Sequence, residues 1–546
     1  MLTRRELVTT LGQAFLAPHL GPLMTSFSGA PAKSTRCVNV VNFIRGFEPR
    51  FKTDLLLPVQ KQMELIKEHK LPATWLLQFD ALVSGPFVSF LKDNMAGGHE
   101  VGTWFEMNEM HCKAAGVEWR GRPGYEWDHL PFVAFSIGYT KDERIKLADT
   151  AMHEFKKVWG HYPRSVASWN LDSWTMAHLT ETYGIDAYAV CRDQIATDGF
   201  TIWGAPIAGY YPSSLNCWSP ALEEHHQIGT PVFRMLGQDP VYYYGREWKM
   251  PDGKMASFPD TMEPVWPSGQ SHTFVDRFLA MIEQAPTLRF AYLQMGQENS
   301  FPWTDQAAAY PYQMAALAEM RDRGKVHVET MGESGRRFKK TFKVTPAQSQ
   351  VQLSDPFGID PPSESIWYQS RFYRANLHIK EGLPYLRDLT VYRDDLKQPF
   401  LESPTRDSFV EQRMPAVLDG YHWAGPRTGG FFMVDGQEVR VAGKIEVSEE
   451  RESLITRLPL ASGRLLTVAF NAETLSASIS AGSLALSFQW DPSKSAFRGF
   501  QGTRIEYRRE DADYAIEVLV GKVSKQVGGY EINQGPNEIR VRLAQR

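Results

Sequence analysis

The chain has 546 residues, of which 43% are hydrophobic and 22% are charged, and its formal net charge at pH 7 is -4. A single hydrophobic core stops growing near roughly 250 to 300 residues, so at least two domains are expected. This composition excludes a disordered, collagenous or coiled-coil chain, and the slightly acidic balance argues against nucleic acid as a partner.

The N-terminus has the features of a twin-arginine export signal. Arg4 and Arg5 precede a short, mildly apolar stretch, and Ala30-Pro-Ala32 supplies a small-residue cleavage site. The apolar stretch is shorter than the roughly 20 residues that a membrane-spanning helix requires. We therefore predict a signal peptide over residues 1–33, export to the periplasm or beyond, and no membrane insertion once the signal has been cleaved. A frayed amphipathic terminus is the alternative.

Residues 34–345 alternate short apolar runs with helical patterns, which is typical of repeated βα units around a parallel sheet. Eight strands are expected, at 38–44, 73–79, 100–105, 165–169, 187–191, 231–236, 289–295 and 326–330. Helical patterns lie between them, at 55–69, 141–158, 174–183, 274–284 and 305–323. The pattern predicts an α/β fold, a TIM-like (β/α) barrel of seven or eight units that carries the catalytic site.

Residues 346–546 show a different sequence pattern. Alternating apolar and polar residues, as in 431–440, 465–470 and 514–520, are separated by turns rich in Gly, Asn and Asp. This pattern predicts a C-terminal β-sandwich domain. Such a domain either binds carbohydrate or packs against the barrel, and the fold alone does not decide between these roles.

Three arginines are expected at the same end of the barrel. The active site of a parallel barrel lies at the C-terminal ends of its strands. Arg45, Arg192 and Arg234 end the first, fifth and sixth predicted strands. The planar guanidinium fork suits a carboxylate, which favours an acidic substrate. The alternative is that each arginine pairs with a nearby acid such as Asp193 or Glu48.

Three acids follow other strands. Asp172 comes after the fourth predicted strand, Glu298 after the seventh and Glu106 after the third. Hydrolysis of a glycosidic bond requires one carboxyl to protonate the leaving oxygen and a second to activate water or attack the sugar. We predict Asp172 and Glu298 as the catalytic pair, with Glu106 in reserve. For Asp172, which precedes a helical stretch, the alternative is a helix N-cap.

Further substrate contacts are expected from side chains near the same strand ends. Glutamine can hold an attacking water, and aromatic rings often form flat platforms for sugars. The candidate residues are Asn42, Gln294, Gln297, Trp104 and Trp169.

Several motifs resemble those of the glycoside hydrolase/deacetylase superfamily of (β/α) barrels, over residues 38–345. They are Gly98-His-Glu-Val-Gly102, Ser168-Trp-Asn-Leu-Asp172 and a late Tyr292-Leu-Gln294. The runs that begin at Asn42, Trp119, Gly199 and Trp367 also resemble a largely uncharacterised family of exported bacterial proteins with a barrel and a β-domain.

The resemblance has consequences for metal binding. Metal-dependent deacetylases of the superfamily carry an Asp-Asp pair at the end of strand one and a His-Thr-x-x-His motif after the glycine motif. Here Ile44 and Arg45 stand at the first place, and Trp104 and Asn108 at the second. A zinc site needs three N, O or S ligands and an open position, so the resemblance implies no metal and no other cofactor.

The resemblance to the retaining glycosidases of the superfamily is also partial. Their nucleophile lies in a Trp-x-x-Glu motif, to which Trp169-Asn-Leu-Asp172 is similar, and their strand-seven acid falls near Gln294. Glutamine cannot donate a proton as a carboxylic acid does. Glu298 would supply the acid from further away, which favours an inverting mechanism.

Together these features predict an exported glycoside hydrolase that removes an acidic sugar, a sialic or uronic acid, from a glycan. Two alternatives remain. One is a carbohydrate deacetylase with a rearranged site, and the other is a noncatalytic glycan-binding protein.

Overall fold

The structure is a computed structural model. It describes residues 35–545 except for 51, 192–199, 203–206, 236–238, 244–247, 250–254, 257–269, 284–285, 287, 353–362, 409, 421–422, 424–426, 451, 492–493 and 511. The predicted signal peptide and Arg192 therefore lie outside the described residues. No helix among the described residues has the length and apolar character needed to span a membrane.

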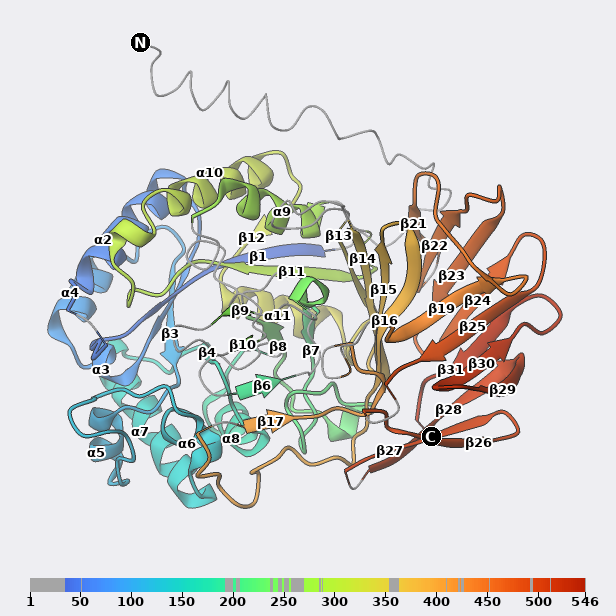
Figure 1. The fold of residues 1–546 in the computed structure, drawn as a ribbon. Coiled ribbons are helices and arrows are strands. Elements are labelled where there is room, and N and C mark those ends of the chain that lie inside the picture. The colour runs from blue at the N-terminus through green and yellow to red at the C-terminus, as the bar shows by residue number, and fades with distance from the viewer. Residues whose placement is uncertain are drawn as a thin grey trace, which may run out of the picture.

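Parallel strands form an almost closed barrel (Figure 1). Its strands are β1 (Thr35–Ile44), β2 (Thr74–Leu77), β3 (Glu100–Trp104), β4 (Ser165–Ser168), β5 (Ala187–Val190), β7 (Gly209–Tyr210), β8 (Val232–Arg234), β11 (Phe290–Met295) and β12 (His327–Val328). Their order is β11-β1-β2-β3-β4-β5-β8-β7, with β12 also paired to β1. Only β7 runs antiparallel to its neighbour in this part of the described chain. Each of the eight predicted runs overlaps one of the parallel strands, so the barrel prediction is confirmed at this level.

Helices cover the outside of the barrel. They are α2 (Leu56–Glu68), α3 (Phe79–Leu82), α4 (Gly85–Asn94), α5 (Glu109–Ala115), α6 (Pro131–Ala134), α7 (Lys141–Trp159), α8 (Ser173–Tyr183), α9 (His272–Glu283), α10 (Ala309–Asp322) and α11 (Met331–Thr341). The longest, α7, begins with a capping box between Thr140 and Glu143 and ends at Gly160, whose φ of 80° suits glycine. The second predicted strand run ends early, because Phe79 already begins α3.

The side chains of β1 alternate between two cores. Val41 and Phe43 belong to the core inside the barrel. Val40 and Ile44 belong to the core between the barrel and its outer helices. This alternation, which has a period of two residues, decides which residues near the strand ends face the inside of the barrel.

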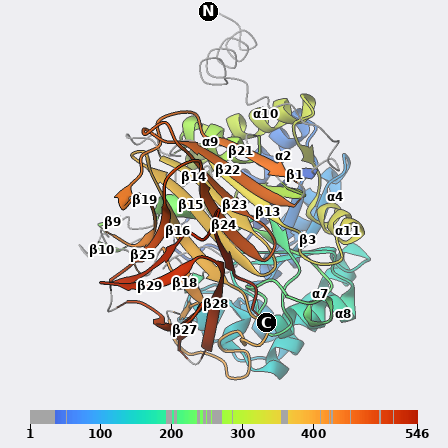
Figure 2. The same cartoon turned by 90° about the vertical axis from the view of Figure 1, so that its right-hand side faces the viewer.

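The C-terminal part forms two antiparallel sheets that share one core (Figure 2). The first contains β13 (Gln348–Gln352), β14 (Ser363–Gln369), β15 (Tyr373–Lys380), β16 (Leu383–Val391), β18 (Ala416–Leu418), β19 (Gly429–Val434), β20 (Gln437–Glu438), β25 (Leu484–Gln489), β29 (Lys522–Gln526) and β30 (Gly529–Asn533). The second contains β21 (Glu446–Glu450), β22 (Ser453–Pro459), β23 (Leu465–Phe470), β24 (Thr474–Ile479), β26 (Phe497–Gln501), β27 (Arg504–Arg509), β28 (Ala512–Val520) and β31 (Ile539–Arg542). This arrangement supports the predicted sandwich.

The two parts of the chain are closely joined. The Gln348 side chain accepts a hydrogen bond from the Gly209 N–H at 3.3 Å and donates one to the Gly209 carbonyl. The Gln369 side chain makes the same pair of bonds with Ile207. The C-terminal sheet therefore satisfies the backbone of the β7 edge, where the hydrogen-bonded order of the barrel ends.

One segment of the C-terminal part also returns to the barrel. Strand β17 (Val410–Gln412) pairs in parallel with β6 (Phe200–Ile202) of the barrel part. Upstream of β17, the backbone carbonyls of Phe400 and Leu401 accept hydrogen bonds from the Arg144 guanidinium. The sequence pattern had predicted a simple succession of two domains and gave no sign of this return. One further short pair, β9 (Trp248–Lys249) with β10 (Met255–Ala256), completes the described strands.

Candidate functional site

Arg45 follows β1 directly and bridges two carboxylates that come from other strand ends. Its Nη2 lies 2.9 Å from Glu106 Oε2, and its Nη1 lies 2.6 Å from Glu298 Oε2. Nη1 also donates to Ser300 Oγ at 3.2 Å. The three charged residues are buried, with exposed fractions of 2%, 2% and 4%. The structure thus brings Glu106 and Glu298 together on the guanidinium group of Arg45, and all three residues were predicted as part of the site.

Aromatic rings surround this group. The Trp127 ring lies against the guanidinium, 4.2 Å from ring centroid to Cζ, and its Nε1 donates to Glu106 Oε2 at 3.1 Å. Phe43 stacks on Trp104 at 4.1 Å, and both meet the edge of Trp169. The predicted Trp104 and Trp169 therefore lie inside the barrel next to the charged site, within a packed aromatic cluster.

The backbone around Arg45 is held from two sides. Asn299 Oδ1 accepts from the Arg45 N–H at 2.8 Å, and Asn299 Nδ2 donates to the Arg45 carbonyl at 3.0 Å. Asp80 Oδ2 accepts from the Phe47 N–H at 3.0 Å. Between them, a Cβ at Gly46 would lie 2.9 Å from atoms of Asp80 and Ala81, so only glycine fits. These contacts fix the chain from which the guanidinium extends.

Burial shifts the protonation of two acids at this site. It raises the pKa of Glu298 from 4.5 to about 7, an effect that Arg45 and Arg50 partly oppose. It also raises the pKa of Asp80 to about 6, against the lowering effect of the backbone N–H groups that Asp80 accepts. A carboxyl with a pKa near 7 exchanges protons readily at neutral pH, as a general acid or base requires.

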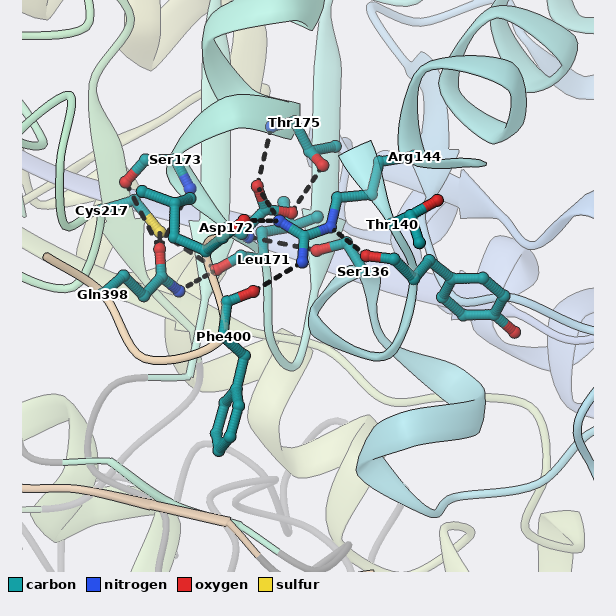
Figure 3. A network of polar contacts seen from close by, with 12 residues as sticks. Ser136, Thr140, Arg144, Leu171, Asp172, Ser173, Thr175, Cys217, Gln398 and Phe400 are labelled. Carbon is teal, nitrogen blue, oxygen red and sulfur yellow. Dashed lines mark hydrogen bonds and ion pairs between the residues drawn. The ribbon is translucent and has the colours of Figure 1, made fainter. Parts of the chain in front are cut away.

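Asp172 lies in a different network, shown in Figure 3. Its Oδ1 accepts from the Thr175 N–H at 3.0 Å, so Asp172 is the N-cap of α8. The same oxygen lies 3.1 Å from Nη1 of Arg144, and Oδ2 accepts from the Thr175 hydroxyl at 2.6 Å. Asp172 and Glu298 therefore have different partners, whereas Glu298 shares Arg45 with Glu106, the reserve acid.

The prediction of three arginines for an acidic substrate is not supported. Arg45 is neutralised by two internal acids. Arg234 is buried, donates to Gln350 Oε1 at 3.5 Å and lowers the otherwise raised pKa of the buried Asp239. These contacts correspond to the alternative of internal pairing, while Arg192 lies outside the described residues.

The remaining predicted contacts point in different directions. Asn42 Oδ1 accepts from the Gln297 N–H at 3.0 Å and from the Tyr310 hydroxyl of α10 at 2.9 Å, so Asn42 faces the outer helices. Gln294 lies inside the barrel on β11, where its Oε1 accepts from the Tyr292 hydroxyl at 3.4 Å. Asn42 and Gln297 thus support the turn after β11, and Gln294 faces the interior.

The residues at the positions of the deacetylase ligands do not fit a metal ion. Ile44 packs in the outer core and Trp104 in the inner core. Asn108 Oδ1 accepts from the His111 N–H at 2.8 Å as the N-cap of α5. The side chain that enters this region from β1 is the cationic Arg45. Among the described residues, no three side chains of His, Cys, Asp or Glu are grouped to hold a metal.

Sequence reasoning missed three residues that contact or support Arg45. Asp80 follows β2, so the rule that selects polar residues at strand ends would have found it had the rule been applied there. Asn299 is adjacent to the predicted Glu298. Trp127 lies in a loop that is far in sequence from any strand end, and no sequence signal indicated it.

Comparison with known proteins gives a likeness in fold. No family model matches the chain, and no curated protein matches it. A solved structure described as a "putative glycoside hydrolase/deacetylase" from Parabacteroides distasonis is 18% identical, covers 67% of this chain and 87% of its own, and has a TM-score of 0.51. A "putative polysaccharide deacetylase" from Mycobacterium smegmatis is 14% identical, covers 60% of this chain and 97% of its own, and has a TM-score of 0.35. The first likeness shows a similar fold and no more, so the predicted superfamily and the predicted exported family both stay predictions.

Proposed function

We propose that this protein is a carbohydrate hydrolase that removes acyl groups from sugars and uses carboxylates in place of a metal ion. One observation carries the proposal: at the C-terminal end of the barrel, two buried glutamates from different strand ends share one guanidinium, and Glu298 has a pKa of about 7. The fold likeness to a protein described as a glycoside hydrolase/deacetylase supports the same class of reaction. Export by the predicted signal is part of the proposal.

In this mechanism Glu298 moves the proton. As a carboxylate it takes a proton from the water that attacks the acyl carbon, and as a carboxylic acid it returns that proton to the leaving nitrogen or oxygen of the sugar. Arg45 keeps part of the Glu298 population ionised, because its positive charge opposes the effect of burial. Glu106 and Trp127 hold the other edge of the guanidinium and so orient it. No step requires a metal ligand.

A glycoside hydrolase is the second candidate, and one observation favours it. Glu106 and Glu298 converge from β3 and β11, and glycosidic cleavage needs two carboxyls near one bond. This candidate differs from the earlier prediction, because Glu106 takes the place of Asp172. It also makes no use of an acidic sugar, because Arg45 already has internal partners.

Product analysis separates the two candidates. The full chain is incubated with N-acetylated, O-acetylated and unacetylated oligosaccharides, and acetate and new reducing ends are measured. Acetate release that Glu298→Gln lowers by at least about 10²-fold supports the proposal. Reducing ends without acetate indicate the glycosidase. Glu329→Gln is the matched control, because Glu329 is also buried and paired with an arginine, Arg337, but lies near the start of β1. Equal activity of Glu298→Gln and the control would reject both candidates.

A further inference from the structure

The charged site is closed to solvent in this structure. Arg45, Glu106 and Glu298 are each at most 4% exposed. The Trp127 ring lies 4.2 Å from the Arg45 guanidinium, and its Nε1 donates to Glu106 Oε2 at 3.1 Å. The proposed hydrolysis requires substrate and water to reach Glu298. Some part of the cover over these residues therefore has to move.

Trp127 belongs to a segment, residues 121–129, that contains no helix or strand and is called the flap below. Both ends of the flap are attached to the structure outside the barrel. Before it, the Arg120 guanidinium donates to the Gly138 carbonyl at 2.8 Å. After it, the Leu130 carbonyl accepts hydrogen bonds from two N–H groups of α6, both at 2.9 Å. These two attachments set the limits of the flap.

The flap is held together by its own side chains. Arg122 donates from Nε and Nη2 to the Asp128 carboxylate, at 2.7 and 3.0 Å. The same guanidinium lies over the Tyr125 ring, with Cζ 4.1 Å from the ring centroid. A bidentate contact of this kind holds both side chains in one geometry. We therefore expect the flap to move as one unit.

The side chain that attaches the flap to the barrel is that of Trp127. Of the side chains of residues 121–129, all of which the structure describes, those of Trp127 and Asp128 are buried. Asp128 has its partner, Arg122, inside the flap. Trp127 alone of the two has its polar partner in the barrel, where it also lies over two cations, Arg45 and Arg50.

The backbone of the flap adds one short contact. Asn108 and Trp127 form an isolated β-bridge, next to which the Glu126 carbonyl accepts from the Glu109 N–H at 2.8 Å. Glu109 is exposed, so water replaces this partner at little cost. Opening of the flap therefore depends mainly on how firmly the Trp127 ring is held.

We propose that the flap opens to admit substrate to the charged site, and that Trp127 is the residue that keeps it closed. In the closed form, the indole ring orients the Arg45 guanidinium and excludes water from its pairs with Glu106 and Glu298. In the open form, one face of the guanidinium and one oxygen of Glu106 are uncovered. The inference goes beyond the proposed function and rests on it only in taking Glu298 as the group that substrate has to reach.

The test measures access to the site by thiol labelling of the full chain. Ser300 is fully buried and accepts from Arg45 Nη1 at 3.2 Å, so Ser300→Cys places a nearly isosteric thiol in the closed site. The four native cysteines are also fully buried and add only a slow background. The rate of reaction with iodoacetamide is measured for Ser300→Cys alone and together with Trp127→Ala.

The chain offers two matched controls. Ser334 on α11 is also fully buried, and its hydroxyl accepts from Asn39 of β1 at 2.9 Å, away from the flap. Ser334→Cys therefore reports opening of the barrel elsewhere. Trp174 on α8 also lies against a cation, with its ring centroid 4.5 Å from Lys141 Nζ, so Trp174→Ala removes a similar contact outside the flap.

We expect Trp127→Ala to raise the labelling rate of Ser300→Cys at least about 10-fold, because a local opening loses its main anchor. The rate for Ser334→Cys should not change, and Trp174→Ala should leave both rates unchanged. With Trp127 intact, labelling of Ser300→Cys should depend little on urea below the unfolding transition, because a small opening exposes little surface. Labelling of Ser334→Cys should rise steeply with urea.

Two results would overturn the inference. One is equal labelling of Ser300→Cys with and without Trp127, and the other is a urea dependence as steep as that of Ser334→Cys. If Trp127→Ala accelerates both cysteines because it destabilises the whole chain, the urea series with Trp127 intact decides. Labelling does not involve turnover, so an opening flap without any hydrolysis rejects only the proposed function, and hydrolysis with a flap that fails these tests rejects only the inference.

Discussion

Arg144 Nη1 and Asp172 Oδ1 lie 3.1 Å apart, and both side chains are almost fully buried. Arg144 comes from α7, and Asp172 caps α8. The same guanidinium donates to the backbone carbonyl of Phe400, on the segment that returns from the C-terminal part (Figure 3). The pair therefore connects two helices and the returning segment at one point.

This arrangement makes a prediction for Asp172→Asn. Asparagine keeps a cap acceptor for Thr175 but removes the charge that balances Arg144. We expect the free energy of unfolding to fall by about 3 to 5 kcal/mol, because one partner of a buried ion pair is left without the other. Urea unfolding at pH 7 measures it. Full stability together with a loss of activity of about 10²-fold would instead support the catalytic role predicted from the sequence.

A second prediction concerns pH and Glu298. The folded chain holds the Glu298 proton up to a pH of about 7, whereas the unfolded chain releases it near 4.5. The folded state therefore loses stability from this group as pH rises from about 4.5 to 7. Glu298→Gln is neutral throughout, so its free energy of unfolding minus that of wild type should be larger at pH 8 than at pH 4.5, by up to about 3 kcal/mol. Unfolding series at the two pH values measure the difference, and the same difference at both would contradict the raised pKa.

A third prediction concerns Arg45→Met. Without the guanidinium, Glu298 loses the cation that most strongly lowers its pKa, so the pKa of Glu298 should rise above 7. The limb of the pH–activity profile that reports Glu298 should move to higher pH, and the stability loss should be larger at pH 8 than at pH 5. Arg50→Met is the graded comparison, because Arg50 also lowers the pKa of Glu298 but less strongly. An unchanged profile in both variants would show that Glu298 does not limit activity.

A fourth prediction concerns metal. The resemblance to the deacetylases places Ile44, Arg45, Trp104 and Asn108 at their metal-ligand positions, so we expect acetate release to persist after dialysis against a chelator. Elemental analysis of the purified protein completes the measurement. Stoichiometric zinc, together with activity that is lost on chelation and restored by zinc, would identify a metal-dependent enzyme whose ligands lie at other positions of the chain.

Much of the barrel and part of the site could be predicted from sequence. Short apolar runs reveal parallel strands, and the strand-end rule led to Arg45, Glu106 and Glu298, because such residues meet wherever parallel strands end together. The sequence could not show which of these residues form ion pairs, because ion pairing depends on side-chain geometry. For the same reason, the sequence could not predict that Asp172 pairs with Arg144.

The contacts between the barrel and the C-terminal sheets also could not be predicted from the sequence. Gln348 and Gln369 read as ordinary polar positions of strands, because nothing in an alternating pattern shows that a glutamine faces a backbone edge instead of solvent. Trp127 covers Arg45 from a loop, and a loop position carries no periodicity from which to place it.

The glutamine contacts at β7 have a practical consequence for anyone who isolates the barrel. Exposed strand edges pair with other chains and promote aggregation, and soluble proteins keep them covered. Here Gln348 and Gln369 cover the edge at Gly209 and Ile207. A fragment cut at residue 345 would lose both amides and present a bare edge to its neighbours. Its poor solubility would then reflect a missing cover, and would say nothing about whether the barrel itself is correctly folded.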